Sequence, residues 1–89
     1  MKAIITVIGV DQMGIIAEVS TLLAKNKVNI LDINQTILDE YFTMTMLVDL
    51  EKLEISLEKL KEKLNEKGEE LGVSVKLQHE DIFRSMHRI

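Results

Sequence analysis

The fold depends on the stretch Val10-Asp11-Gln12-Met13-Gly14-Ile15, which lies between an apolar run typical of a strand and a run with helical periodicity. A short strand-to-helix turn leaves the first backbone N–H groups of the helix unpaired and pointing outward. Together with the positive end of the helix dipole, these groups suit a carboxylate or a phosphate. Gly14 carries no Cβ, so a ligand or a neighbouring chain can approach its backbone closely, and Asp11 is well placed to cap the helix. Taken alone, the turn also fits a capped helix start that binds nothing.

The segments on either side of this turn predict a central strand and an amphipathic helix. Residues 3–10 are rich in β-branched residues, and both of their alternating faces are largely apolar, which is typical of a strand covered on both sides. Asn26 is a candidate for the left-handed residue that ends the helix. The helix, residues 14–26, places five apolar side chains at three- and four-residue spacing: Ile15, Ile16, Val19, Leu22 and Leu23.

The rest of the chain predicts a hairpin, a second helix and a fourth strand. Residues 28–38 alternate with one change of phase, which a bulge or a twist near Ile30-Leu31 would reconcile. Asp39-Glu40 is a plausible hairpin turn, and the alternation resumes in a third strand. A leucine seam then predicts a second helix, in which Gly68 weakens the last turn and which Gly72 ends. The remaining ranges are 41–50 for the third strand, 54–71 for the second helix, 73–78 for the fourth strand and 79–89 for a short amphipathic tail.

The element order β-α-β-β-α-β is that of the ferredoxin-like split βαβ fold. We therefore expect an α+β sandwich, with a four-stranded antiparallel sheet, two helices on one face and a short C-terminal helical tail. Residues 1–89 would form one domain, with the core in 1–79 and the tail in 80–89. The uncovered face would carry Ile4, Ile8, Leu47 and either Ile33 or Ile37. Such an apolar patch usually marks an interaction site, so we expect a homodimer or a higher homo-oligomer; the alternative is that the tail folds back over this face.

The composition argues against several classes of protein. No apolar run approaches the length of a membrane span, and the residues after Met1 show no charged-then-apolar leader. With the absence of cysteine, these features predict a soluble cytoplasmic protein that does not bind membranes. The net charge of −4 argues against nucleic acid, because binding its backbone needs clustered lysine and arginine. The lysines of residues 59–67 are interleaved with glutamates, as on a solvated helix face.

Side chains suited to catalysis or metal binding are scarce. No cysteine can act as a nucleophile or form a metal-binding loop, and no serine has an obvious histidine and aspartate context. Strand 3–10 has no aromatic residue of the kind an RNA-recognition sheet needs, and residues 10–14 have no arginine to hold a phosphate. His79 and His87 are only a weak metal signal. We therefore expect no enzymatic activity, no cofactor and no metal site.

Several motifs resemble the ACT domain. The first is Val7-Ile8-Gly9-Val10-Asp11-Gln12-Met13-Gly14-Ile15-Ile16-Ala17-Glu18-Val19, the second is Val28-Asn29-Ile30-Leu31-Asp32-Ile33, and Phe42-Thr43-Met44 continues the match. The resemblance covers the whole β-α-β-β-α-β region. Residues 78–89 are similar to the tail of a bacterial family of stand-alone single-ACT-domain proteins.

This resemblance implies a regulatory module that binds a small molecule, most often an amino acid, and that is not an enzyme. ACT domains commonly pair side by side through their second strands, with the ligand at the interface. Backbone N–H groups of the turn would take the ligand carboxylate, Asp11 would accept from its ammonium, and Asn29 would both donate and accept. Met13 and Ile15 would touch the ligand side chain. The matching positions are Asp11, Gln12, Met13, Gly14 and Ile15 of one chain, with the partner's Asn29, Ile30 and Leu31.

The resemblance leaves the ligand and the regulated protein open. Gln12-Met13 stand where many amino-acid-binding ACT loops have a proline or a charged residue. With no second domain to regulate in cis, the module would act on an unidentified protein in trans. The alternative is a ligand-free protein–protein interaction or assembly module that uses the outer sheet face or the C-terminal tail.

Overall fold

The computed structural model describes residues 1–10 and 13–81, and it confirms the predicted element order. The second helix begins at Leu57 rather than at Glu54, because Ser56 is its N-cap and the Ser56 Oγ accepts a hydrogen bond from the Lys59 N–H at 3.1 Å. Residues 82–89, which carry most of the predicted tail, lie outside the described residues. The elements are β1 (Lys2–Val10), α1 (Ile15–Lys25), β2 (Asn29–Leu38), β3 (Tyr41–Asp49), α2 (Leu57–Leu71) and β4 (Ser74–His79).

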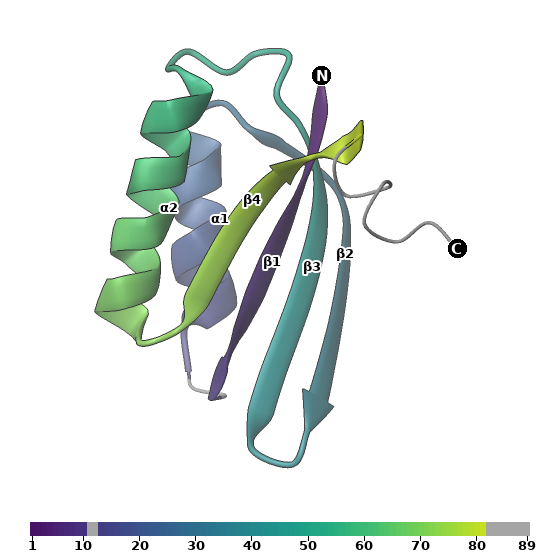
Figure 1. Cartoon of the computed structure of the whole chain (residues 1–89), viewed down its shortest axis with the longest axis vertical. Coiled ribbons are helices and arrows are strands. Elements are labelled where there is room, and N and C mark those ends of the chain that lie inside the picture. Colours follow the sequence, from purple (N-terminus) through teal and green to yellow (C-terminus); the bar gives the residue numbers. More distant parts are fainter. Residues whose placement is uncertain (11–12, 82–89) are drawn as a thin grey trace.

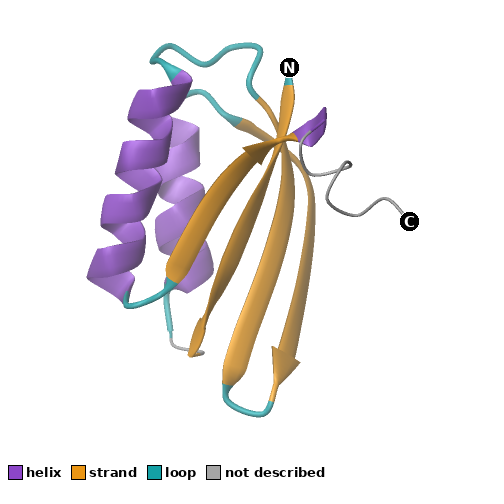
Figure 2. Cartoon of the chain, in the orientation of Figure 1, coloured by secondary structure: helices purple, strands orange, loops and turns teal. Residues whose placement is uncertain are grey.

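The four strands form one antiparallel sheet in the order β2-β3-β1-β4, so β1 is central as predicted. Both helices lie on the same side of this sheet, which gives the ferredoxin-like sandwich (Figures 1 and 2). The β2–β3 register shifts between Ile30 and Asp32, so Leu31 is the extra residue of a bulge. The predicted bulge is therefore confirmed. No helix among the described residues is long and apolar enough to cross a membrane.

The core lies between the sheet and the two helices. The helix-facing side chains of β1 and β3 are buried, and they meet the apolar stripes of α1 and α2. Ile16, which the sequence placed in the stripe of α1, is 38% exposed, so the buried stripe is narrower than predicted. The largest fully buried side chains are Ile5, Ile15, Leu23, Met44, Met46, Leu60 and Leu64, with Val7, Val19 and Val48.

The C-terminal end of α1 differs from the prediction, whereas that of α2 agrees with it. Asn26 has a φ of −100°, and Lys27 has the positive φ, 61°. The Asn26 Nδ2 donates a hydrogen bond to the Leu22 carbonyl oxygen at 2.8 Å. This bond ties Asn26 to the last turn of α1, so the chain reverses one residue later. Gly72, with a φ of 74°, ends α2 as predicted.

Helix α2 is held against α1 and against β4 at its C-terminal end. The Lys67 Nζ lies 3.3 Å from the Oε2 of Glu18 on α1 and 3.3 Å from the Oε2 of Glu70. These two carboxylates, Glu70 first, raise the pKa of Lys67 above its usual 10.5. Gly68 is buried, and a Cβ built on it would lie 2.7 Å from the Val73 carbonyl oxygen. Gly68 therefore allows α2 to approach β4, a role that the sequence prediction missed.

The outer face of the sheet is less apolar than predicted. Ile33 faces Met46 and Ile37 faces Phe42 across the strands, and directly opposed residues share a face. Both isoleucines therefore lie on the helix side, and their placement on the outer face was wrong. They are nevertheless 42% and 57% exposed, because the helices cover the β1 and β4 side of the sheet and leave β2 uncovered (Figure 1).

Candidate ligand-binding site

The turn between β1 and α1 presents backbone donors and little side-chain chemistry among its described residues. Gly14 is the N-cap of α1 with a φ of 92°, and no side chain of the described residues caps this helix end. The Glu18 N–H donates to the Gly14 carbonyl oxygen at 2.9 Å, which leaves the N–H groups of the three preceding residues at the open end of the helix. Asp11, the predicted cap, and Gln12 lie outside the described residues. A carboxylate at this end would meet backbone N–H groups and the positive end of the helix dipole.

The side chains of this turn divide sharply by exposure. Met13 is fully exposed, at 100% of its reference area, and is available to contact a ligand. Ile15 is 2% exposed and packs in the core, so only its backbone N–H faces the turn. A Cβ built on Gly14 meets no atom within 4 Å, so the space beside the turn is open.

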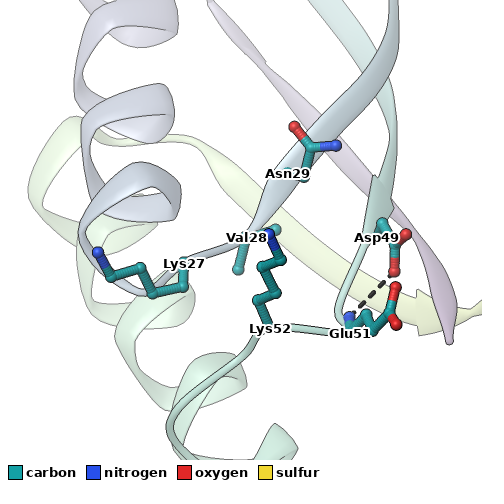
Figure 3. A pocket seen from close by; sticks show the side chains of 6 residues that line it. All are labelled: Lys27, Val28, Asn29, Asp49, Glu51 and Lys52. Atoms are coloured by element: carbon teal, nitrogen blue, oxygen red, sulfur yellow. Dashed lines mark hydrogen bonds between the residues drawn. The ribbon is translucent and has the colours of Figure 1, made fainter.

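Of the second predicted half of the site, at the start of β2, Asn29 lines a pocket of about 430 Å³, and Ile30 and Leu31 do not. Asn29 is exposed and lies opposite Asp49, the last residue of β3. Figure 3 shows the Lys52 side chain directed toward Val28 and Asn29, whereas the Lys27 ammonium points away from them. The pocket is lined by Lys27, Val28, Asn29, Asp49, Glu51 and Lys52.

Three charged residues of this pocket lie at the tight loop that follows β3. The Asp49 Oδ1 accepts a hydrogen bond from the Glu51 N–H at 3.0 Å, so Asp49 orders the loop that follows β3. Lys52 supplies positive charge, and Asp49 and Glu51 supply negative charge, whereas the Lys27 ammonium points away from Asn29. A pocket that combines both signs with an amide side chain suits a small zwitterion better than an ion of one sign.

The sequence prediction named Asn29 but missed its charged neighbours. These neighbours could have been found from the hairpin turn at Asp39-Glu40. Pairing the residues of the two strands outward from this turn places the start of β2 beside the end of β3. The bulge at Leu31 then decides that Asn29 faces Asp49 rather than Leu50.

The two predicted halves lie at opposite ends of the sheet in one chain. Val10 pairs with Tyr41 at one end of β1, and Lys2 pairs with Asp49 at the other. Asn29 is next to Asp49 and therefore lies far from the β1–α1 turn. The two ends of a nine-residue strand are about 27 Å apart. The structure thus does not bring Met13 or Gly14 near Asn29 within a single copy.

The hydrogen-bond alternation identifies which backbone groups face outward at the edge of β2. The Leu50 N–H donates to the Met1 carbonyl oxygen at 2.8 Å, in the register that places Lys2 opposite Asp49. Met1 and Leu50 are therefore a hydrogen-bonded pair, and in an antiparallel sheet such pairs recur at every second residue. Odd-numbered residues of β1 thus bond to β3, and even-numbered residues bond to β4. Across β3, the same alternation places the N–H and C=O groups of Ile33, Gln35 and Ile37 on the open side of β2. The Ile33 N–H donates to the Asp32 Oδ1 at 2.9 Å, in the same strand.

His79 has a local interaction and no metal-like surroundings in the described part of the chain. Its Nδ1 accepts a hydrogen bond from the Asp81 N–H at 3.2 Å, and the Asp81 Oδ2 lies 3.7 Å from the same nitrogen. The described residues contain no group of three or more histidine, cysteine or acidic side chains placed to hold a metal ion. His87 lies outside the described residues.

A family profile described as the ACT domain matches residues 2–78. A UPF0237 protein of Clostridium acetobutylicum is 62% identical over 89 residues, which is 100% of each chain. An ACT domain protein from Streptococcus pneumoniae has a solved structure that matches with a TM-score of 0.82 and 43% identity, over 93% of each chain. The regulatory subunit of aspartate kinase from Thermus thermophilus matches with a TM-score of 0.67 and 26% identity, over 86% of this chain and 50% of that subunit.

Proposed function

The chain belongs to the ACT-domain family, whose members are generally regulatory modules for small molecules, and we propose that it binds an amino-acid-sized ligand between two copies of itself. The observation that carries this proposal is the separation of the two predicted half-sites in a single chain. The β1–α1 turn and Asn29 lie at opposite ends of a sheet whose β2 edge is open. A second copy whose β2 runs antiparallel to the first would bring its Asn29 to the β1–α1 turn of the first copy, and the reverse would hold for the other turn.

The open groups of β2 support one particular pairing. With Gln35 of both copies opposite each other, Ile33 of one copy faces Ile37 of the other, and neither residue bonds to β3. The Ile33 N–H would exchange its bond to the Asp32 Oδ1 for a bond to the second copy. The two isoleucines, half-exposed in one copy, would cover each other. Because the pairing is antiparallel, the partner's Asn29 lies at the end of the sheet where Gly14 begins α1.

Each half then has a chemical role. The N–H groups at the start of α1 bind the ligand carboxylate, and the partner's Asn29 binds the amino group or a polar side chain. Met13 contacts the ligand side chain, while Ile15 contributes its N–H because its side chain is buried. Asp11 and Gln12, whose part in the site follows from the resemblance in sequence, lie outside the described residues. We propose that the ligated dimer acts on a separate protein in trans.

Light scattering and a thermal-shift screen of the common amino acids test this proposal together. The expected mass is twice the 10.2 kDa of one chain. A ligand at a hundredfold excess over its Kd should stabilise the fold by about 2.7 kcal/mol. A monomer in solution, or no thermal shift with any amino acid at millimolar concentration, would overturn the proposal.

Two variants separate the interface from the ligand contact. Gln35→Pro removes an N–H that points to the open edge, so it should abolish the dimer and the thermal shift while β2 still pairs with β3. Asn29→Leu should abolish the thermal shift and leave the dimer intact. Asn34→Leu, an exposed asparagine in the same strand, is the matched control and should change neither.

A second candidate function is ligand-free assembly through the outer sheet face. The observation that favours it is an apolar patch at the hairpin end of this face, where Val10, Tyr41 and Leu38 are paired across three strands and more than half exposed. Assembly through this patch would give a mass above that of a dimer. Leu38→Ser with Tyr41→Ser should then return the protein to the dimer, whereas Asn29→Leu should not.

A further inference from the structure

Helix α2 and strand β4 form a wedge that opens away from Gly68. At Gly68 the two elements are in contact, and the Val73 N–H donates to the Gly68 carbonyl oxygen at 2.8 Å. From there they diverge toward Leu57 and His79 (Figure 1). The space between them is a groove of about 580 Å³ with Leu57 and Leu64 on the helix side. We call this groove the α2–β4 wedge.

The wedge follows the free edge of β4 rather than one face of the sheet. Its lining includes Val75 and Leu77, which point toward the helices, and also Lys76 and Gln78, which lie on the other face. The hydrogen-bond alternation of the sheet joins the even-numbered residues of β4 to β1. The N–H and C=O groups of Val75 and Leu77 therefore point outward, and no described strand pairs with them.

The charge of the wedge opposes that of the protein as a whole. Lys61 and Lys76 line it, together with the ring of His79, and none of the described lining residues is acidic. Asp81 is an acid in contact with the lining, since its Oδ2 lies 3.7 Å from the His79 Nδ1. The protein carries a net charge of −4, so this edge is a local positive site on an acidic surface.

We propose that the α2–β4 wedge is a docking site for an acidic, extended peptide segment of a partner protein, which adds to the sheet beside β4. The backbone of the peptide would pair with Val75 and Leu77. Its alternate side chains would point into the wedge against the half-buried Leu57 and outward beside Lys76. This site lies at the opposite edge from β2 and goes beyond the proposed ligand site, so it stands whether or not an amino acid binds.

A second copy is a poorer occupant of this edge than an acidic peptide. The symmetric pairing in which Val75 of one copy faces Leu77 of the other would place Lys76 of one copy directly opposite Lys76 of the other. Like charges directly opposite each other destabilise a strand pair. An acidic side chain at the same position forms an ion pair instead.

Amide exchange measured by nuclear magnetic resonance gives a test specific to strand addition. In the free protein the N–H groups of Val75 and Leu77 should exchange at least tenfold faster than that of Lys76, which bonds to β1. The probe is a capped heptapeptide that alternates glutamate with valine. At saturation it should slow exchange at Val75 and Leu77 at least tenfold and shift their resonances.

Matched variants separate the contribution of the lysine charges to peptide binding from that of the backbone hydrogen bonds. Lys61→Glu with Lys76→Glu should raise the Kd of the peptide about tenfold. Lys25→Glu with Lys59→Glu makes the same change of net charge outside the wedge and should leave the Kd within twofold. Val75→Pro removes an outward N–H without touching the bonds to β1, so it should abolish binding, whereas Gln35→Pro should retain it.

Three outcomes would overturn the docking proposal. A heptapeptide with lysine in place of glutamate could bind as well as the acidic one. The acidic peptide could bind with no protection of Val75 and Leu77. Inorganic phosphate could reproduce the same resonance shifts, which would make the wedge a site for small anions. None of these outcomes bears on the dimer or on the thermal shift with amino acids.

Discussion

The substitution Gly68→Ala tests the close approach of α2 to β4, on which the shape of the wedge depends. Alanine is a better helix former than glycine by about 1 kcal/mol, so helix propensity alone predicts a more stable protein. The structure predicts the opposite sign. The added Cβ would lie 2.7 Å from the Val73 carbonyl oxygen and 3.1 Å from the Val75 Cγ2. Because the first of these atoms belongs to the backbone, the clash cannot be relieved by a side-chain rotation.

The movement that relieves this clash also strains the turn after α2. The Val73 N–H donates to the Gly68 carbonyl oxygen at 2.8 Å, so the same two residues would have to separate. Overpacking of this kind costs about 1–3 kcal/mol. After subtracting the gain in helix propensity, we expect a net loss of about 1 kcal/mol in the free energy of unfolding.

Urea denaturation followed by circular dichroism, at a fixed protein concentration, measures this loss. With an m-value of about 1 kcal/mol/M, the midpoint should fall by about 1 M. Gly72→Ala is the control, because a Cβ on Gly72 meets no atom within 4 Å and only the positive φ of 74° is strained. It should lose about 1 kcal/mol without moving α2 from β4. A midpoint for Gly68→Ala above that of the wild type would refute the close approach.

Two further substitutions test the ends of the helices. Ser56→Ala removes the acceptor of the Lys59 N–H and should cost about 1 kcal/mol in urea denaturation, and Ser56→Asp should restore most of it. Lys67→Met removes the link between Glu18 and Glu70 and should lower the melting temperature at neutral pH. The folded-state pKa of Lys67 is raised, so its contribution is present below its usual pKa of 10.5 and is lost as the pH rises through the raised value. The difference in melting temperature should therefore begin to shrink above pH 10.5 and vanish above the raised pKa, and a difference that did not shrink with rising pH would contradict the link.

The fold could be predicted because each segment carries its own periodicity. The phase change in residues 28–38 predicted the bulge, and the register confirms it at Leu31. Gly72 marked the end of α2 because the residue type and the required positive φ agree. The corresponding prediction for Asn26 was wrong, because the Asn26 side chain donates to the Leu22 carbonyl oxygen and the positive φ occurs at Lys27. A local propensity predicts well until a side chain finds a competing partner.

The lateral position of the helices could not be predicted from periodicity. Alternation shows which residues of a strand share a face, but it does not show whether a helix lies above them. Ile33 and Ile37 share the helix side with buried neighbours of β3 and are nevertheless exposed, because α1 and α2 lie over the other half of the sheet. The approach of α2 to β4 depends on Gly68, a residue that sequence rules treat only as a weak point in a helix.

The two open edges of the sheet differ in chemistry, and this difference assigns them to different kinds of partner. An open edge is a template for unwanted strand pairing unless it is covered or charged. From Ile33 to Leu38, β2 carries no charged residue, and the outward backbone groups of Ile33, Gln35 and Ile37 are flanked by exposed apolar side chains. Continuous cover would remove this liability, and the proposed dimer would supply it.

The β4 edge has the opposite character. It is six residues long, and the charged residue Lys76 stands near its centre. A lysine on a short edge strand opposes pairing with a second copy and still permits pairing with an acidic segment. We therefore expect the β2 edge to hold the two copies together permanently and the β4 edge to bind its partner reversibly. The salt dependence should differ accordingly, because added salt weakens the lysine-dependent contact and leaves the apolar β2 interface intact.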